Sequence, residues 1–278
     1  MIDQTELRNL LSIAINAAIK AGKLIMEVYN SNDFHVNLKS DKTPLTLADR
    51  QAHTEIANSL SKTRIPTLSE EGRNILYEER KGWEYFWLVD PLDGTKDFIK
   101  RNGEFTVNIA LIINGYPIMG VVYVPVLENL YFSLKPEGSY KVTSIEPTLT
   151  PSLRYDELTS IGNKLPLAKK HDKFTVVGSR SHMNHDTEEY IASLEKKYGD
   201  INLINRASSL KMCMVAEGIA DIYPRFNSMW EWDTAAGQAI VEEAGCFVIS
   251  AETNQRLVYN KEDLHNPWFI VKAKQSIG

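Results

Sequence analysis

The chain has 278 residues, of which 43% are hydrophobic and 24% charged, and its formal net charge is −5. These values are typical of a soluble globular protein with room for two lobes, and the acidic balance excludes nucleic-acid binding by bulk charge. Because the only two cysteines, Cys213 and Cys246, lie in apolar stretches, we expect buried, reduced thiols and a cytoplasmic location.

The N-terminal half is predicted to begin with helices and to continue with strands. Its first residues lack the basic start and apolar core of a signal peptide. Apolar residues at helical spacing predict helices over residues 5–29 and 47–60. Residues 85–89 form a continuous apolar run that stops at Asp90-Pro91, which is typical of a buried strand followed by a turn. Further strands are expected at residues 106–113, 118–124 and 129–133, with Asn114-Gly115 as a hairpin turn.

The C-terminal half mixes strands and helices. Residues 136–173 are rich in Pro, Ser, Thr and Lys, so we predict a boundary near residue 145 between lobes of residues 1–145 and 146–278. Strands are expected at residues 174–178, 220–223, 246–249 and 268–272, and helices at residues 187–198, 209–217 and 234–244. We expect no integral membrane segment. Peripheral association with the inner face of the cell membrane and the oligomeric state are left open.

Two aspartates follow the strand predicted before Asp90. Asp93 comes three residues later, behind a proline, and Gly94 permits tight backbone geometry. Two carboxylates on one turn can bridge hard cations, and the Leu92 carbonyl between them can add an oxygen, a ligand set that favours magnesium or manganese over zinc. An ordinary Asx turn is the alternative. The combination of two acids, Pro, Gly and a hydroxyl behind a buried strand favours the metal site.

Three further acidic positions could complete that site. Glu70 follows an apolar segment with the pattern of a strand, although a solvated loop acid would have the same pattern. Asp49 forms a capping-box pattern with Thr46, which explains it structurally. Asp233 precedes a predicted helix and could be its N-cap, a place that also directs a carboxylate toward an anion and its metals. His53, four residues after Asp49, is more simply a structural histidine.

Three segments together resemble the signature motifs of the inositol monophosphatase superfamily, whose members are magnesium-dependent, lithium-sensitive phosphomonoesterases. They are Ser69-Glu70-Glu71, Asp90-Pro91-Leu92-Asp93-Gly94-Thr95 and Trp232-Asp233-Thr234-Ala235-Ala236-Gly237. Residues 93–108, 179–182, 208–211 and 223–226 resemble more specifically the CysQ branch, the bacterial 3′(2′),5′-bisphosphate nucleotidases. Lys96-Asp97 stands where the inositol and fructose phosphatases usually carry Thr-Asn. The segment of residues 145–170 is longer than expected for this branch, so the resemblance implies no substrate or metal contact there.

The resemblance implies a fold, a reaction and a set of site residues. The implied fold is α+β, a two-lobed layered α-β-α-β-α sandwich with the site between the lobes. The implied reaction is hydrolysis of the 3′-phosphate of adenosine 3′,5′-bisphosphate to AMP and phosphate, with two or three Mg²⁺ ions per site. The implied metal ligands are Glu70, Asp90, the Leu92 carbonyl, Asp93 and Asp233, and the implied catalytic residues are Asp49, Thr95 and Glu70. The implied substrate contacts are Gly94, Thr95, Ser179, His182, Ser208, Lys211, Arg225 and Asp233.

A bisphosphorylated nucleoside needs a second anion site beside the metals. Lys211 and Arg225 are the candidates, because burial of the second phosphate in an acidic protein is costly without cations. Two other functions remain open. An inositol or sugar monophosphatase would share the metal chemistry and differ in specificity, whereas a metal-binding or nucleotide-sensing module would lack turnover. Phosphate release from a panel of substrates separates the three.

Overall fold

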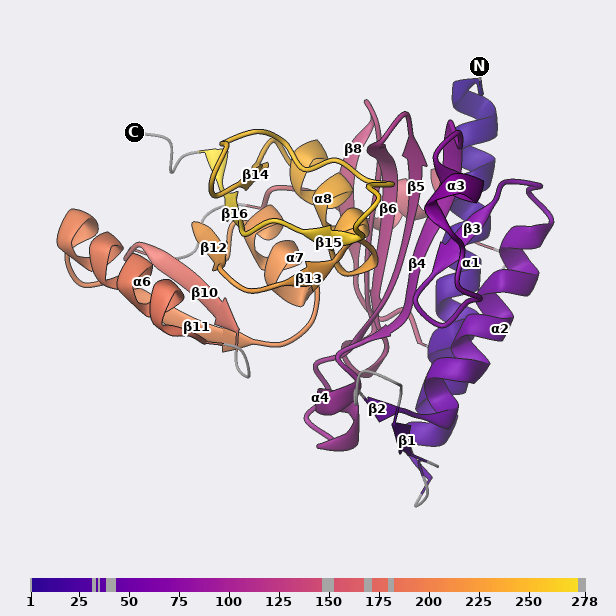
Figure 1. Ribbon diagram of the computed structural model, residues 1–278, viewed down its shortest axis with the longest axis horizontal. Helices are drawn as coiled ribbons and strands as arrows, with labels where there is room; N and C mark the ends of the chain where they lie inside the picture. Colours follow the sequence, from indigo (N-terminus) through magenta and orange to yellow (C-terminus); the bar gives the residue numbers. More distant parts are fainter. Residues whose placement is uncertain are drawn as a thin grey trace.

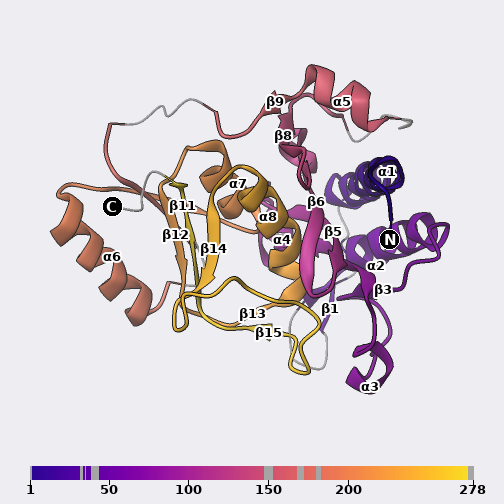
Figure 2. The ribbon, with the colours of Figure 1, turned by 90° about the horizontal axis from the view of Figure 1, so that it is seen from above.

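The computed structural model describes residues 2–31, 34, 36–38, 44–146, 153–167, 172–179 and 183–274. Helices and sheets alternate in layers, in the order helix, sheet, helix, sheet, helix (Figure 1). The view from above shows the same order, with the two longest helices at one side and α6 at the other (Figure 2). This is the layered α-β-α-β-α arrangement that the sequence led us to expect.

The long helices form the outer and central layers. α1 (Gln4–Tyr29) and α2 (Leu47–Ser61) cover the outer face of the larger sheet. α7 (Leu210–Glu217) and α8 (Glu231–Glu243) lie between the two sheets, and α6 (His185–Tyr198) covers the far face of the smaller one. The shorter helices are α3 (Tyr77–Arg80), α4 (Thr95–Ile99), α5 (Tyr155–Ile161) and the 3-10 helix η1 (Pro125–Leu127).

The larger sheet has seven strands in the order β3-β4-β5-β6-β7-β8-β9. Its strands are β3 (Thr67–Ser69), β4 (Tyr85–Asp93), β5 (Thr106–Ile113), β6 (Tyr116–Val124), β7 (Asn129–Leu134), β8 (Gly138–Val142) and β9 (Asn163–Lys164). Only the β3–β4 pair is parallel among them. Asn114 and Gly115 both have positive φ, 51° and 79°, as the predicted hairpin turn requires.

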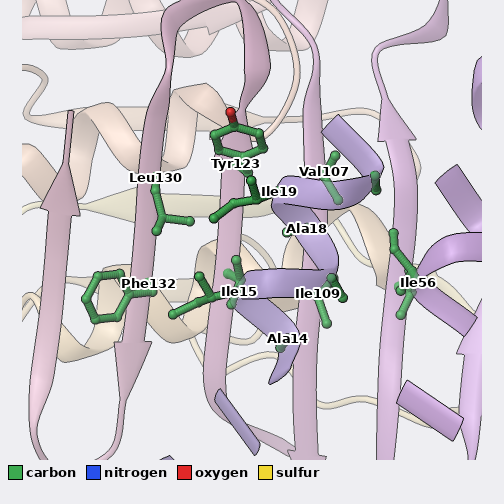
Figure 3. Close-up of a cluster of buried hydrophobic side chains, with 14 of the residues drawn as sticks. Ala14, Ile15, Ala18, Ile19, Ile56, Val107, Ile109, Tyr123, Leu130 and Phe132 are labelled. Atoms are coloured by element: carbon green, nitrogen blue, oxygen red, sulfur yellow. The ribbon is translucent and has the colours of Figure 1, made fainter. Parts of the chain in front are cut away.

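A continuous apolar core joins α1 to the larger sheet. The helical period of α1 puts Ile15 and Ile19 on its inner face, where they lie beside Ile109, Leu130 and Phe132 (Figure 3). All five side chains are fully buried, and burial of each such side chain stabilises the fold by about 1.5–3 kcal/mol. This core fixes the strands that carry the candidate site.

The opposite face of the larger sheet packs on α8. A Cβ atom added at Gly120 of β6 would lie 2.3 Å from the carbonyl oxygen of Ala236, so only glycine permits this close approach. The contact holds the N-terminal end of α8, and with it Asp233, near the ends of the strands. The helix begins at Glu231 rather than near residue 234, so Asp233 is its third residue and not the expected N-cap.

The smaller sheet has five strands in the order β11-β10-β12-β16-β14. They are β10 (Thr175–Ser179), β11 (Asn202–Arg206), β12 (Ile222–Arg225), β14 (Phe247–Ser250) and β16 (Phe269–Lys272). Two small two-stranded sheets pair β1 (Asn37–Leu38) with β2 (Pro44–Leu45) and β13 (Met229–Trp230) with β15 (His265–Asn266). Cys213 and Cys246 are buried and free, as expected. Within the described residues, no helix combines the length and apolar character that crossing a bilayer requires.

The segment after residue 145 returns to the first lobe. Tyr140 of β8 pairs with Lys164 of β9, and Tyr155 and Leu158 of α5 are buried in the core beneath α1. The division of the chain into two lobes stays a proposal. These contacts favour a crossing to the second lobe near Leu165 rather than at residue 145. The polar composition of this segment suggested the earlier boundary, but α5 still buries an apolar face against the first lobe.

Candidate active site

The end of β4 presents two aspartates through an irregular stretch of sheet. Asp90 lies opposite Asn108 and Asp93 opposite Thr106, so the register shifts between them. The sequence pattern had indicated a strand that stops at Asp90. The strand instead continues to Asp93. The Asp90 Oδ1 atom accepts a hydrogen bond from the Leu92 N–H at 3.0 Å. A bulge of this kind re-aims side chains at the edge of a site.

Three carboxylates from distant parts of the chain meet at this point. Glu70 follows β3, Asp90 lies on β4 and Asp233 lies in the first turn of α8, and one oxygen of each lies within 4.8 Å of the others. Burial raises the pKa of Asp90 well above its usual value, and the charges of Glu70, Asp93 and Asp233 raise it further. Burial likewise raises the pKa of Asp233, and the charges of Asp93 and Glu70 raise it further. Clustered negative charge of this kind suits a hard divalent cation.

Asp93 stands beside this group and is held by donors from β5 and from the residue before α7. Its Oδ2 atom accepts hydrogen bonds from the Ser209 N–H at 2.7 Å and from Ser209 Oγ at 2.9 Å. Asn108 Nδ2 lies 3.4 Å from the same oxygen. Burial raises the pKa of Asp93, while Lys211 and the Ser209 hydrogen bonds oppose that rise.

Asp49 caps a helix and also contacts Thr95. Its Oδ2 atom accepts from the Thr46 N–H at 2.7 Å and closes the capping box of α2. Its Oδ1 atom accepts from Thr95 Oγ1 at 3.0 Å, and Thr95 Oγ1 also lies 3.3 Å from the Leu92 carbonyl oxygen. Burial raises the pKa of Asp49. A capping residue thus also contacts the hydroxyl next to the metal-ligand candidates.

A cavity of about 280 Å³ adjoins the acids. Its lining includes most of the residues expected to contact substrate, namely Gly94, Ser179, Ser208, Lys211, Arg225 and Asp233, and it also includes the expected metal ligand Asp93. His182 lies outside the described residues. His53 bonds Ser69 Oγ through Nδ1 at 2.9 Å, next to Glu70, which agrees with a structural role.

Lys211 and Arg225 form a buried cationic side of the cavity. Lys211 Nζ donates to the Ser208 carbonyl at 2.6 Å, and burial lowers the pKa of this lysine to about 8, with the nearby Arg225 charge adding to the effect. Arg225 is 7% exposed, and its buried Nε atom has no hydrogen-bond partner in the described part of the chain. The buried Ser208 Oγ also has none there. Buried donors without partners at a cavity wall suit an anionic ligand.

Sequence reasoning missed several residues around the cavity. Asp97 and Trp230 line it, and Trp230 stacks on Trp232 with ring centroids 5.0 Å apart. Asn108 and Ser209 hold Asp93, although neither had been assigned a role. One available signal was Asn108 itself, a polar side chain inside the apolar run of β5, because a buried amide requires partners.

Comparison with known proteins places this chain in a family. A model of the inositol monophosphatase family matches residues 6–275. The chain belongs to the inositol monophosphatase family. Within it, the 3′(2′),5′-bisphosphate nucleotidase CysQ of Salmonella typhimurium is 40% identical over 257 residues, which cover 91% of this chain and 96% of that protein. The family resemblance seen in the three motifs is confirmed.

Solved structures agree with the family assignment. The crystal structure of CysQ from Bacteroides thetaiotaomicron, a bacterial member of the inositol monophosphatase family, has 50% sequence identity and a TM-score of 0.89. The match covers 96% of this chain and 98% of that one. An inositol monophosphatase from Anabaena shares the fold at 21% identity, with a TM-score of 0.68 over 97% of this chain and 92% of that one. The expected α+β sandwich of this family is confirmed.

Proposed function

We propose that the chain is a magnesium-dependent 3′(2′),5′-bisphosphate nucleotidase that hydrolyses the 3′-phosphate of adenosine 3′,5′-bisphosphate to AMP and phosphate. The observation that carries the proposal is one cavity that is lined both by acids and by buried cations. Asp93 and Asp233 line it together with Lys211 and Arg225. A relative that is 40% identical over most of the chain bears this activity in its name.

The donor set fits the metal that the family implies. Glu70, Asp90 and Asp233 offer carboxylate oxygens within 4.8 Å of one another, and no nitrogen or sulfur ligand joins them in the described residues. Hard oxygen donors favour Mg²⁺. We assign two or three Mg²⁺ ions to a ligand set consisting of Glu70, Asp90, the Leu92 carbonyl, Asp93 and Asp233.

Bound Mg²⁺ would lower the pKa of the attacking water and neutralise charge on the leaving oxygen. Thr95 and Asp49 would orient that water and take its proton, because Thr95 Oγ1 already donates to Asp49 Oδ1. Burial raises the pKa of Asp49, which makes its carboxylate a stronger proton acceptor. The N–H groups of Gly94 and Thr95 would donate to the phosphate being cleaved.

The second phosphate would bind at the cationic residues of the cavity. Lys211 and Arg225 supply its charge, and Ser179 and Ser208 supply hydroxyls there. His182 remains a proposed contact. The 5′-phosphate would be held by these cations and only the 3′-phosphate by the metals, so the AMP product would keep its 5′-phosphate.

The test is phosphate release, with and without Mg²⁺, from bisphosphonucleotides, inositol phosphates and fructose 1,6-bisphosphate. We expect the highest kcat/KM for adenosine 3′,5′-bisphosphate and no activity in chelator. Preference for an inositol or sugar phosphate would support the alternative enzyme, and binding without turnover would support a sensing module. A cytoplasmic location stays a prediction.

A further inference from the structure

We infer that Asn108 and Ser209 are positioning residues that fix the Asp93 carboxylate, so that Oδ2 is held by the protein and Oδ1 is left for the metal. The inference rests on the magnesium part of the proposed function. It concerns neither the metal ligands themselves nor the substrate contacts. It explains why two polar side chains are buried between β5 and the N-terminal end of α7, at 1% and 2% exposure.

Three donors converge on one oxygen of Asp93. They are the Ser209 N–H at 2.7 Å, Ser209 Oγ at 2.9 Å and Asn108 Nδ2 at 3.4 Å. Among the residues that the structure describes, none donates to Oδ1. A carboxylate with one oxygen saturated by donors presents the other as a single, directed ligand. Asp93 is therefore oriented before any ion arrives.

The direction of each hydrogen bond follows from Asp93, because a carboxylate only accepts hydrogen bonds. Asn108 therefore turns its Nδ2 atom toward Asp93, and its Oδ1 atom accepts from Thr106 Oγ1 at 2.9 Å. Asn108 Nδ2 then donates to Ser209 Oγ at 2.9 Å. This order uses every polar atom of the Asn108 side chain. A fully satisfied buried network of this kind is rigid.

Ser209 also joins two aspartates that are far apart in the chain, Asp93 and Asp233. Its Oγ atom lies 2.7 Å from the Asp233 carbonyl oxygen as well as 2.9 Å from Asp93 Oδ2. The hydroxyl has one proton, so it donates to one acceptor at a time and stays between the two. This contact sets the spacing between Asp93 on β4 and the first turn of α8.

The backbone before Ser209 is strained to make this arrangement. Ser208 has φ of 52°, in the left-handed region that non-glycine residues rarely adopt. Its carbonyl accepts a hydrogen bond from the buried Lys211 Nζ at 2.6 Å. Local strain of this type persists only where surrounding contacts determine it, and it is concentrated at functional sites. Here the strained turn directs the Ser209 N–H at Asp93.

The test is Mg²⁺ binding to the full chain without substrate, by isothermal titration calorimetry. Mg²⁺ demands near-octahedral geometry, and loss of partners that orient a ligand typically weakens affinity about 10–100-fold. We expect Ser209→Ala and Asn108→Ala each to weaken at least one Mg²⁺ site by about tenfold or more. Ser209→Ala keeps the backbone donor and is the milder change. Ser133→Ala is the matched control, since Ser133 is a fully buried serine of β7, in the sheet that contains Asn108, and its hydroxyl has no partner in the described residues.

A second readout separates positioning from a general structural role. If Ser209 acts through metal affinity, phosphatase activity of Ser209→Ala should recover when Mg²⁺ is raised by the same factor as the loss of affinity. A folded Ser209→Ala variant with wild-type Mg²⁺ affinity would overturn this inference and leave the proposed function standing. A wild-type chain that binds no Mg²⁺ would overturn both.

Discussion

Replacing Asp90 by asparagine should stabilise the metal-free protein while it removes activity. Asp90 is 1% exposed and shares its surroundings with Glu70 and Asp233. Its Oδ1 atom accepts from the Leu92 N–H, and an asparagine amide oxygen can keep that bond. The substitution therefore removes a charge from the cluster with little change of shape.

The size of the effect follows from the spacing of the carboxylates. At 4.8 Å and an effective dielectric constant of about 20, each charged pair repels by about 3.5 kcal/mol. The raised pKa of Asp90 lets the cluster take up a proton, which limits the relief. We expect a gain of about 2 kcal/mol in the free energy of unfolding, which corresponds to about 4 °C in Tm for a chain of this size.

The pH dependence has a definite sign. The pKa of Asp90 is higher in the folded than in the unfolded protein, so its contribution is favourable below the unfolded pKa and is lost as pH rises through the folded one. The metal-free wild type should therefore lose stability between acidic and neutral pH. Asp90→Asn should lose less over the same interval.

The assay is thermal unfolding in chelator and in Mg²⁺, at acidic and at neutral pH, together with phosphate release. Asp221→Asn is the control, because Asp221 is a buried acid that accepts from the Thr175 N–H in the smaller sheet, outside the cluster. Mg²⁺ should raise the Tm of the wild type more than that of Asp90→Asn. An Asp90→Asn protein that is less stable than the wild type in chelator at neutral pH would refute the reasoning.

Three further predictions concern the reaction. Arg225→Ala should raise KM for adenosine 3′,5′-bisphosphate at least tenfold and change activity on a monophosphate far less; equal losses in steady-state kinetics would mean that Arg225 serves the fold. Thr95→Val should lower kcat about a hundredfold with little change in KM, since it removes the hydroxyl bonded to Asp49, and near-normal kcat would exclude Thr95 from water activation. Because burial lowers the pKa of Lys211 to about 8, kcat/KM for the bisphosphate should fall as pH rises through about 8 and the cation is lost. The same step in a Lys211→Met protein would contradict that assignment.

Local sequence patterns predicted the parts of the molecule that depend on neighbouring residues. The spacing of apolar residues predicted α1, α2 and β5 almost to the residue. The acids at Asp90 and Asp93 were predicted as a metal site because they share one turn. The capping role of Asp49 could likewise be predicted from four consecutive residues, Thr46 to Asp49, because a capping box joins residues that are three positions apart.

Long-range contacts account for what the sequence did not predict. Asn108 and Ser209 are 101 residues apart and act on Asp93 only when β5 and α7 pack together. The bulge that carries β4 beyond Asp90 depends on pairing with β5. From the sequence, Pro91 indicated that the strand ends at Asp90, because proline rarely lies inside a strand. Neither feature has a local pattern that distinguishes it from an ordinary polar residue or turn.

The most direct test of the proposed function is the identity of the products, followed by ³¹P NMR in a reaction of the wild-type protein with adenosine 3′,5′-bisphosphate. The account predicts equal amounts of inorganic phosphate and 5′-AMP, formed with Mg²⁺ and not in chelator, with no further cleavage of the AMP. Release of the 5′-phosphate, continued hydrolysis to adenosine, or no reaction while an inositol phosphate is cleaved would contradict it.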